Sequence, residues 1–206
     1  MDCMEGMKQY PDKYFDLAIV DPPYGIGASE FTMGTGKNKK FSKGKMWDTS
    51  PPPLEYYEKL FRVSKNQIIW GGNYFINVLP ISKSWIVWDK LLNKDISFSD
   101  GELAWTSFTR PLKIAKIQYS GFLGMDLERI HPTQKPVKLY EWCLVNFAKE
   151  GDKILDTHLG SQSSRIAAYK LGFDFWGFEI DKDYFEQGNQ RFEKESKLIC
   201  HNDDLF

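Results

Sequence analysis

The sequence predicts an α/β fold with a mostly parallel sheet flanked by helices, and two observations lead to this prediction. In the second half of the chain, apolar strand segments alternate with helical segments, an order typical of parallel strands joined by crossover helices. Two of the expected strands also end abruptly in polar or small residues, as strands do where they open into a ligand crevice. The 206 residues are 42% hydrophobic and 27% charged, which suits a single domain with one sizeable core.

The first half begins with a strand and a long polar segment. The apolar run at residues 15–20 stops before two successive prolines, Pro22 and Pro23, which cannot continue a central strand. Residues 25–50 are polar and glycine-rich, and their length predicts a mobile loop with a functional role. The elements expected after this loop are a helix over residues 54–63 and short strands over residues 67–70, 84–88, 102–108 and 113–119.

The second half begins with a helix. After Pro136, apolar residues recur at spacing four (Leu139, Cys143 and Phe147), which predicts a helix with one buried face. The elements expected next are a strand over residues 153–155, a helix over 163–171, a strand over 175–180 and a charged helix over 183–194.

Composition excludes several classes of protein. No stretch approaches the roughly 18 uninterrupted apolar residues of a membrane span, and the first residues show no signal-peptide pattern. The three cysteines lie far apart and lack a metal-binding spacing. The formal net charge of −1 argues against a surface that is basic all over, although a local basic patch is compatible with it. We therefore expect a cytoplasmic, metal-free protein without membrane association.

Two strand ends in the second half indicate a cofactor site. Residues 155–161 form a turn with small residues that leads into a helix, so backbone N–H groups can approach a ligand closely. The next strand ends near Glu179, where a carboxylate can bind both hydroxyls of a ribose. Together they indicate an adenosine-containing cofactor, and the absence of a G-x-G-x-x-G pattern disfavours NAD. The alternative is a turn glycine and a surface acid in an ordinary βαβ unit.

The Asp-Pro-Pro-Tyr sequence at residues 21–24 indicates catalysis. Its chemistry suits methylation of an exocyclic amine on an aromatic base, a poor nucleophile because its lone pair is delocalised into the ring. The Asp21 carboxylate and the Pro22 carbonyl can accept the two N–H bonds and stabilise the charge that develops on the nitrogen. Pro23 can hold this geometry, and Tyr24 can stack on the base. The alternative is that Asp-Pro-Pro only terminates the strand while Tyr24 packs on the core.

These motifs, together with the segment His131–Pro136, resemble those of the amino-group DNA methyltransferases that use S-adenosylmethionine, in the group whose catalytic motif precedes the cofactor motifs. The resemblance spans nearly the whole chain. It implies a circularly permuted Rossmann-like methyltransferase fold, with residues 131–192 as the cofactor-binding half and residues 96–130 as a short target-recognition segment. The catalytic residues that it implies are Asp21, Pro22, Pro23 and Tyr24. The cofactor-binding residues that it implies are Asp2, Thr133, Lys135, Asp156, His158, Gly160, Ser161, Gln162 and Glu179.

Three positions depart from the family pattern. Gln162 stands where the family loop has its second glycine, close to the expected methionine moiety of the cofactor. His158 replaces a phenylalanine, and we expect it to be a packing or hydrogen-bonding substitute rather than a general base. Asp2 fits the acid that would reach the adenine of the cofactor, but the strand that should position it is missing, which predicts weakened cofactor binding.

A basic surface is expected beside the catalytic turn, because an enzyme that extrudes a base from duplex DNA must hold the backbone. We expect double-stranded DNA as the partner, and the resemblance also implies that a homodimer can form. An ordinary solvated loop is the alternative for the lysine run. The candidate DNA-contacting residues are Lys37, Lys39, Lys40, Lys43 and Lys45 of the loop, with Arg110, Lys113 and Lys116 of segment 96–130.

The sequence therefore predicts an S-adenosylmethionine-dependent DNA methyltransferase acting on adenine N6, from a restriction–modification or phage system. Asp in the first position of the tetrapeptide favours adenine N6 within the family, whereas Ser is common among N4-cytosine enzymes. C5-cytosine chemistry is disfavoured because no cysteine follows a proline. The alternatives left open are an N4-cytosine or RNA amine methyltransferase and a DNA-binding relative that has lost activity.

Overall fold

The computed structural model describes residues 1–27, 48–92, 99–118, 129–131 and 133–203, with side chains up to residue 198. Seven strands form one sheet in the order β5-β3-β4-β2-β1-β6-β7. The strands are β1 (Phe15–Val20), β2 (Ser64–Trp70), β3 (Trp85–Asp89), β4 (Gly101–Thr106), β5 (Lys113–Lys116), β6 (Lys153–Asp156) and β7 (Asp174–Gly177).

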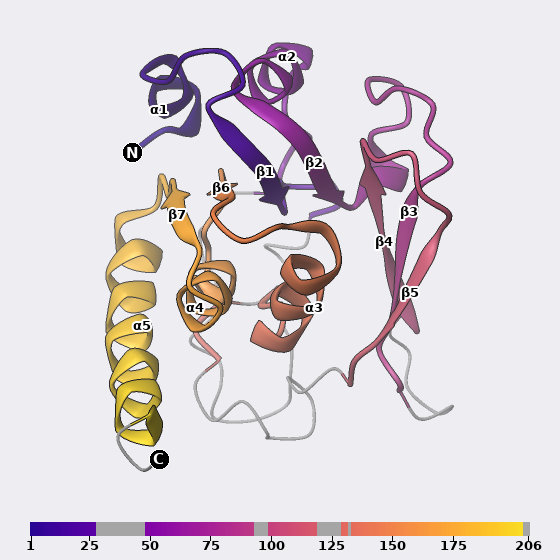
Figure 1. Cartoon of the computed structure of the whole chain (residues 1–206). Coiled ribbons are helices and arrows are strands. Elements are labelled where there is room, and N and C mark those ends of the chain that lie inside the picture. Colours follow the sequence, from indigo (N-terminus) through magenta and orange to yellow (C-terminus); the bar gives the residue numbers. More distant parts are fainter. Residues whose placement is uncertain (28–47, 93–98, 119–128, 132, 204–206) are drawn as a thin grey trace.

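The sheet is mostly parallel. β1 pairs in parallel with β2 on one side and with β6 on the other, and β6 pairs in parallel with β7. Among these seven strands only β4 runs antiparallel to its neighbours, β2 and β3, while β3 and β5 are parallel. The chain starts at β1, builds the side that ends in β5, and then crosses to the other side of β1 for β6 and β7 (Figure 1). The permuted order and the mostly parallel sheet that the sequence predicted are thus confirmed.

Helices cover both faces of the sheet. Alternate residues of β1 face the two layers: Leu17 and Ile19 pack in the cluster that contains α3 and α4, whereas Ala18 and Val20 pack in the cluster that contains α1 and α2. The helices are α1 (Cys3–Lys8), α2 (Leu54–Val63), α3 (Val137–Phe147), α4 (Ser163–Lys170) and α5 (Lys182–Asp203), with a 3₁₀ turn η2 (Gly72–Tyr74).

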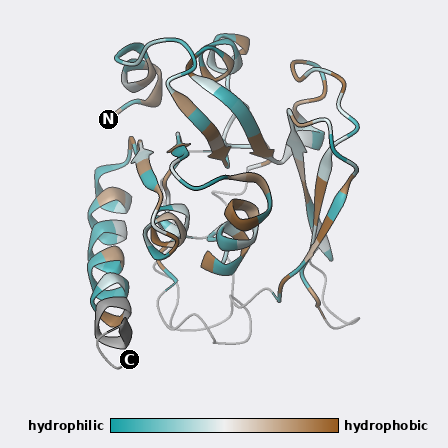
Figure 2. Cartoon of the chain, viewed as in Figure 1, coloured by the Kyte–Doolittle hydropathy of each residue, from teal (hydrophilic) through white to brown (hydrophobic). Residues whose placement is uncertain are grey.

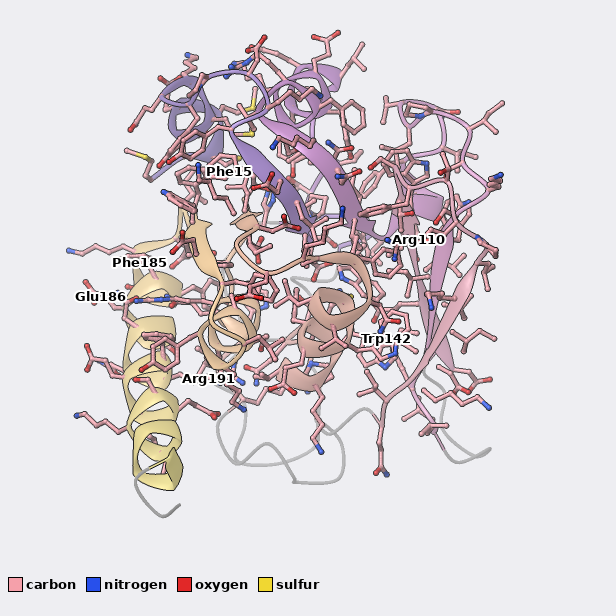
Figure 3. The ribbon with its side chains drawn as sticks, in the orientation of Figure 1. Phe15, Arg110, Trp142, Phe185, Glu186 and Arg191 are labelled. Atoms are coloured by element: carbon pink, nitrogen blue, oxygen red, sulfur yellow. The ribbon has the colours of Figure 1, made fainter. Side chains whose placement is uncertain are left out.

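The long helix α5 lies beside α4 at the β7 end of the molecule, and Figure 2 shows that it is largely hydrophilic. Arg191 reaches from α5 to the start of α4 (Figure 3), where Nη1 donates to the Ser161 carbonyl and to the Ser163 hydroxyl, each at 2.9 Å. This contact braces the loop between β6 and α4. In the part of the chain that is described, no helix is long and apolar enough to cross a bilayer.

The structure differs from the sequence prediction at two places near the N-terminal half of the sheet. The sequence pattern did not predict α1, whose six residues are too few to show a helical period and depend on a cap, the Asp2 carboxylate accepting from the Met4 N–H at 2.6 Å. β2 begins at Ser64, directly after α2 and three residues earlier than expected. Here the Ser64 hydroxyl donates to the Leu60 carbonyl, which ends the helix as the strand starts.

β7 is also shorter than expected and ends at Gly177. The Phe178 N–H donates to the Asp156 carbonyl, and the Phe178 carbonyl accepts from the Leu159 N–H, both at 3.0 Å. These two bonds hold the end of β7 against the loop that follows β6. They bring Glu179 next to that loop instead of extending the strand.

Candidate active site

A cavity of about 380 Å³ opens at the carboxyl ends of β1, β6 and β7. Its volume falls in the range of roughly 300–1,000 Å³ that is usual for small-molecule sites. Asp21 and Pro23 after β1, residues 157–161 after β6 and residues 178–181 after β7 contribute to its lining. Because the three strands are parallel neighbours, the strand ends that the sequence singled out separately converge on one cavity.

Asp21 is held by two partners. Its Oδ1 accepts a hydrogen bond from the Tyr24 hydroxyl at 2.7 Å, and its Oδ2 accepts one from Lys135 Nζ at 2.6 Å. Lys135 Nζ also donates to the Tyr24 hydroxyl oxygen at 3.1 Å, so the three side chains form a closed ring of contacts. Each carboxylate oxygen has two lone pairs, and Asp21 can therefore still accept hydrogen bonds from a further group.

The ring of Tyr24 is held by the turn after β2. Gly71 has a φ of +70°, which glycine adopts without strain, and a Cβ at this position would lie 2.2 Å from Cε1 of Tyr24. Tyr74 stacks on Tyr24 with ring centroids 5.0 Å apart and planes inclined by 18°, and 47% of Tyr74 is exposed. Tyr24 is thus fixed by its hydroxyl, by Gly71 and by an exposed aromatic neighbour.

Burial dominates the electrostatics of this group. It raises the pKa of Asp21; Lys135 counteracts the rise, and the charge of Glu102 adds to it. Burial would lower the pKa of Lys135, but the carboxylates of Asp21 and Glu102 outweigh it, and the pKa is raised. Lys135 therefore remains an ammonium, while Asp21 holds a proton more readily than an ordinary aspartate.

Lys135 was expected to help hold the cofactor, and it does line the cavity. Its ammonium, however, donates to the Asp21 carboxylate, a contact that the sequence did not indicate. Thr133, from the same segment, also lines the cavity, with its hydroxyl 3.1 Å from Nδ1 of His131.

Asp156 is buried and shapes the loop after β6 rather than lining the cavity. Its Oδ2 accepts from the Ser164 hydroxyl at 2.5 Å, and its Oδ1 accepts from the His158 N–H at 2.9 Å. Burial raises the pKa of Asp156 to about 7, although both hydrogen bonds favour the charged form. The position of the neighbouring loop residues, including Gly160 and Ser161 in the cavity wall, depends on these contacts.

His158 lines the cavity as a neutral side chain. Burial lowers its pKa to about 4. Its Nδ1 lies 2.9 Å from the Thr157 hydroxyl, which is in turn 2.7 Å from the Tyr56 hydroxyl. The geometry supports the packing and hydrogen-bonding role expected for this residue.

Glu179 lies next to the start of α1, where the Met1 amino group donates to the Glu179 carbonyl, and Glu179 and the first residues of α1 both line the cavity. Glu179 Oε2 accepts from the Gly160 N–H at 2.8 Å and Oε1 accepts from the Asp181 N–H at 2.9 Å, which leaves lone pairs for a ligand. Burial raises the pKa of Glu179, and its bonds to backbone N–H groups oppose the rise. Asp2 also lines the cavity, and its side chain caps α1.

The Gln162 side chain points away from the cavity, whereas the sequence placed this residue close to the methionine moiety of the cofactor. Gln162 has a φ of +60°, the left-handed conformation for which glycine is suited. Its side chain turns toward α5, where Nε2 donates to the Phe185 carbonyl at 3.2 Å and to Asn189 Oδ1 at 3.0 Å. Its Oε1 accepts from Arg165 at 2.8 Å, and Gln162 does not line the cavity. The Gln162 side chain, which stands where the family has a glycine, therefore lies between α4 and α5.

Replacing Gln162 with glycine is expected to lower the free energy of unfolding by about 1–2 kcal/mol, because lost buried hydrogen bonds outweigh the relief of the left-handed backbone. The dissociation constant for the cofactor should stay within about twofold of the original value, since a shift of that size is under half a kcal/mol. Urea unfolding and calorimetry would measure the two quantities. A stable variant with impaired cofactor binding would show that the side chain acts on the cavity after all.

The residues expected to contact DNA fall into two groups. Lys37, Lys39, Lys40, Lys43 and Lys45 lie outside the described residues. Arg110 (labelled in Figure 3) lies in the connection between β4 and β5, and its side chain reaches the end of α3. Nη1 donates to the Asn146 carbonyl at 2.5 Å, and the guanidinium lies over the rings of Phe108 and Phe147. Its guanidinium is thus engaged by α3, a tertiary contact that the sequence did not indicate. Lys113 and Lys116 lie on the edge strand β5, and Lys116 is exposed.

The described residues on either side of segment 28–47 are joined to each other. The Gly25 N–H donates to Asp48 Oδ1 at 2.8 Å, and the Gly27 N–H donates to the Asp48 carbonyl at 3.1 Å. Ser50 and the prolines that follow it line the cavity. The described residues that flank this segment therefore lie beside the turn at residues 21–24.

Sequence reasoning missed several cavity residues. Gln134 is buried; its Oε1 accepts from the Ile130 N–H at 3.1 Å, and its Nε2 has no hydrogen-bond partner among the described residues. Its place within the segment His131–Pro136 was a signal that could have identified it. The tyrosines Tyr56, Tyr140 and Tyr184 also line the cavity, but their spacing on helices is that of ordinary core residues.

The sheet has the permuted strand order, and its first strand ends in Asp-Pro-Pro-Tyr at the cavity that Glu179 also lines. This combination of fold and site defines an amino-group methyltransferase. The chain belongs to the DNA methylase family of N6 and N4 methyltransferases, whose model matches residues 77–190. It is 25% identical to the type II methyltransferase M.HpaI of Haemophilus parainfluenzae, over 94% of this chain and 73% of that protein. It is 24% identical to the type II methyltransferase M2.DpnII of Streptococcus pneumoniae, over 95% and 89% of the two chains.

Solved structures share the fold. The complex of M1.HpyAVI with SAM superposes with a TM-score of 0.60 at 19% identity, covering 92% of this chain and 96% of that one. The cytosine-N4-specific PvuII DNA methyltransferase also gives 0.60, at 15% identity and with 97% and 89% covered. The predicted fold and the predicted class of DNA amino-methyltransferase are both confirmed.

Proposed function

We propose that this chain transfers a methyl group from S-adenosylmethionine to the N6 amine of adenine in duplex DNA. One observation carries the proposal: Asp21 and Glu179 line the same cavity. A target amine at the Asp-Pro-Pro-Tyr turn and a ribose at Glu179 can therefore be bound at the same time, as direct transfer between them requires.

The cavity residues fit S-adenosylmethionine. Glu179 retains lone pairs for the ribose hydroxyls, and Gly160 beside it gives the cofactor close access to the backbone. Gln134 Nε2 is a buried donor without a partner among the described residues, and a carboxylate in the cavity would satisfy it. The bound cofactor would supply an activated methyl group on its sulfonium. M1.HpyAVI, which has this fold, is a protein known in complex with SAM.

The catalytic turn would prepare the amine for attack. Asp21 would accept one N–H of the target amine and the Pro22 carbonyl the other, which favours a tetrahedral nitrogen with its lone pair toward the methyl group. Positive charge develops on this nitrogen as the new N–C bond forms, and the Asp21 carboxylate stabilises that charge. The raised pKa of Asp21 suits it to receive the proton that the amine then releases.

Adenine is proposed because Asp stands first in the tetrapeptide. Tyr74, stacked on Tyr24, adds exposed aromatic surface on which a flipped base can rest. Cytosine N4 is the second candidate, since the PvuII enzyme of the same fold is cytosine-N4-specific.

Nucleoside mass spectrometry tests the proposal. Unmodified duplex DNA is incubated with the purified chain and S-adenosylmethionine, and N6-methyladenine is the expected product. N4-methylcytosine would keep the mechanism and change the base. Methylation of a structured RNA competitor in preference to the duplex would overturn the assignment of DNA as substrate.

Replacing Glu179 with alanine is expected to weaken S-adenosylmethionine binding by about 10- to 100-fold, the range for hydrogen bonds to a charged group. Isothermal calorimetry would measure the dissociation constant. A matched control is Glu186→Ala, because Glu186 lies on the outer side of α5 (Figure 3) with a 58% exposed side chain. Equal affinity of the Glu179 and Glu186 variants would remove the ribose-binding role.

A further inference from the structure

A second carboxylate, that of Glu102 on β4, contacts the lysine that holds the catalytic aspartate. Glu102 Oε2 lies 3.1 Å from Lys135 Nζ, and Glu102 Oε1 lies 2.9 Å from Lys90 Nζ. We propose that Glu102 and Lys90 are positioning residues for methyl transfer: Glu102 balances the charge of Lys135, and Lys90 balances the charge of Glu102, so that Asp21 stays available to the target amine. This inference rests on the proposed function.

The side chain of Lys135 is closely surrounded by its neighbours. The side chain is 4% exposed and lies between two aromatic rings, with Nζ 5.6 Å from the ring centroids of both Trp70 and Tyr24. The ammonium donates hydrogen bonds to Asp21 and to Tyr24, and Glu102 Oε2 lies 3.1 Å away as its second anionic partner, in an ion pair without hydrogen-bond geometry. Loss of the Glu102 carboxylate would leave Asp21 as the only anionic partner of this ammonium among the described residues.

The charges of the four side chains cancel. Asp21 and Glu102 contribute two negative charges, and Lys135 and Lys90 contribute two positive ones. Methyl transfer places additional positive charge on the amine beside Asp21, and a cluster with excess positive charge would oppose it. Glu102 therefore allows a lysine to orient Asp21 without making the site electropositive.

Neither Glu102 nor Lys90 lines the cavity. Glu102 therefore acts on the site through Lys135, and Lys90 acts through Glu102. The β3–β4 pairing places Glu102 opposite Trp88, and the Lys90 N–H donates to the Asp100 carbonyl at 2.9 Å. Side-chain exposures of 25% for Glu102 and 11% for Lys90 mean that solvent screens their contact only in part. Burial would raise the pKa of Glu102, but Lys135 and Lys90 together lower it to about 2, so its negative charge is retained at neutral pH.

Two variants test the charge balance: Glu102→Gln, and the double variant that adds Lys90→Met to it. We expect Glu102→Gln to lower kcat by about 10- to 100-fold, because a net positive charge close to the reacting nitrogen is left without compensation. Adding Lys90→Met to Glu102→Gln restores neutrality, and the double variant should recover most of the lost kcat. The dissociation constant for S-adenosylmethionine should be unchanged in both.

A second readout follows the network without any turnover. Carbon-13 NMR of labelled aspartate in the cofactor-free protein should show a lower pKa for Asp21 in Glu102→Gln and a return toward the original pKa in the double variant. Among the described residues, Tyr24, Tyr140 and Asp156 are further titratable groups whose ionisation is coupled to Asp21, and all three stay in place in every variant.

The outcomes separate a positioning role from simple packing. Normal kcat and an unchanged Asp21 titration in Glu102→Gln would overturn the inference, as would a double variant slower than Glu102→Gln. If the original chain methylated no nucleic acid, the proposed function would be refuted independently of the charge balance. The Asp21 titrations would still decide whether the four charges are coupled as described.

Discussion

Replacing Asp21 with asparagine is expected to lower the rate of methyl transfer by about 100- to 1,000-fold, the usual cost of losing one preorganised electrostatic contact to a transition state. Asparagine has nearly the same shape and can still accept one N–H bond from the amine. It lacks the negative charge that stabilises the nitrogen as the N–C bond forms, and it cannot accept the released proton. The rate would be measured by incorporation of labelled methyl groups into duplex DNA at saturating cofactor.

Cofactor binding should survive this change, because the proposed function assigns Asp21 to the target amine, and Glu179 with the loop after β6 to the cofactor. Calorimetry should therefore give a dissociation constant for S-adenosylmethionine close to that of the original chain. Asp174→Asn is a matched control: Asp174 is exposed and begins β7, away from the strand end that reaches the cavity. An Asp21→Asn variant with a normal rate of methyl transfer would refute the assigned mechanism.

The ends of the strands were predictable because the residue types that follow the strands are themselves distinctive. Two consecutive prolines must end a strand, and an acid just after an apolar run has to lie at the sheet edge. These local rules identified Asp21 and Glu179, and the alternation of apolar segments identified the sheet. That both residues reach one cavity follows from the parallel pairing of β1, β6 and β7.

Side-chain direction and long-range pairing were not predictable in the same way. Lys135 is 114 positions from Asp21, and only the packing of the segment before α3 against the end of β1 brings them together. Gln162 occupies a position suited to glycine, but where its side chain goes is decided by α5, whose Gly188 leaves the room for it. Glu102 looked like one acid among many, because its role depends on a lysine from another part of the chain.

Replacing Lys135 with methionine is expected to impair stability and activity together, in a way that depends on pH. The change leaves Asp21 buried without its cation, and breaking a buried ion pair from one side typically costs about 3–5 kcal/mol. Burial already raises the pKa of Asp21, and losing the opposing lysine raises it further. A carboxyl whose pKa is higher in the folded than in the unfolded state destabilises the fold as pH rises above the unfolded value. The deficit should therefore be small near pH 4 and grow toward pH 8.

Glu102 has the opposite dependence on pH in the original chain. The pKa of Glu102 falls from 4.5 to about 2 in the folded chain, so its stabilising contribution is complete above pH 4.5 and is lost as pH falls toward 2. Urea unfolding at several pH values would compare the original chain, Lys135→Met and the control Lys138→Met, whose lysine is exposed three residues further on. Methyl transfer by Lys135→Met should also recover with rising pH as Asp21 ionises, even though the fold weakens. A variant that lost stability equally at all pH values would show that Lys135 contributes packing rather than charge, and the role of Lys135 in orienting Asp21 would then have to be abandoned.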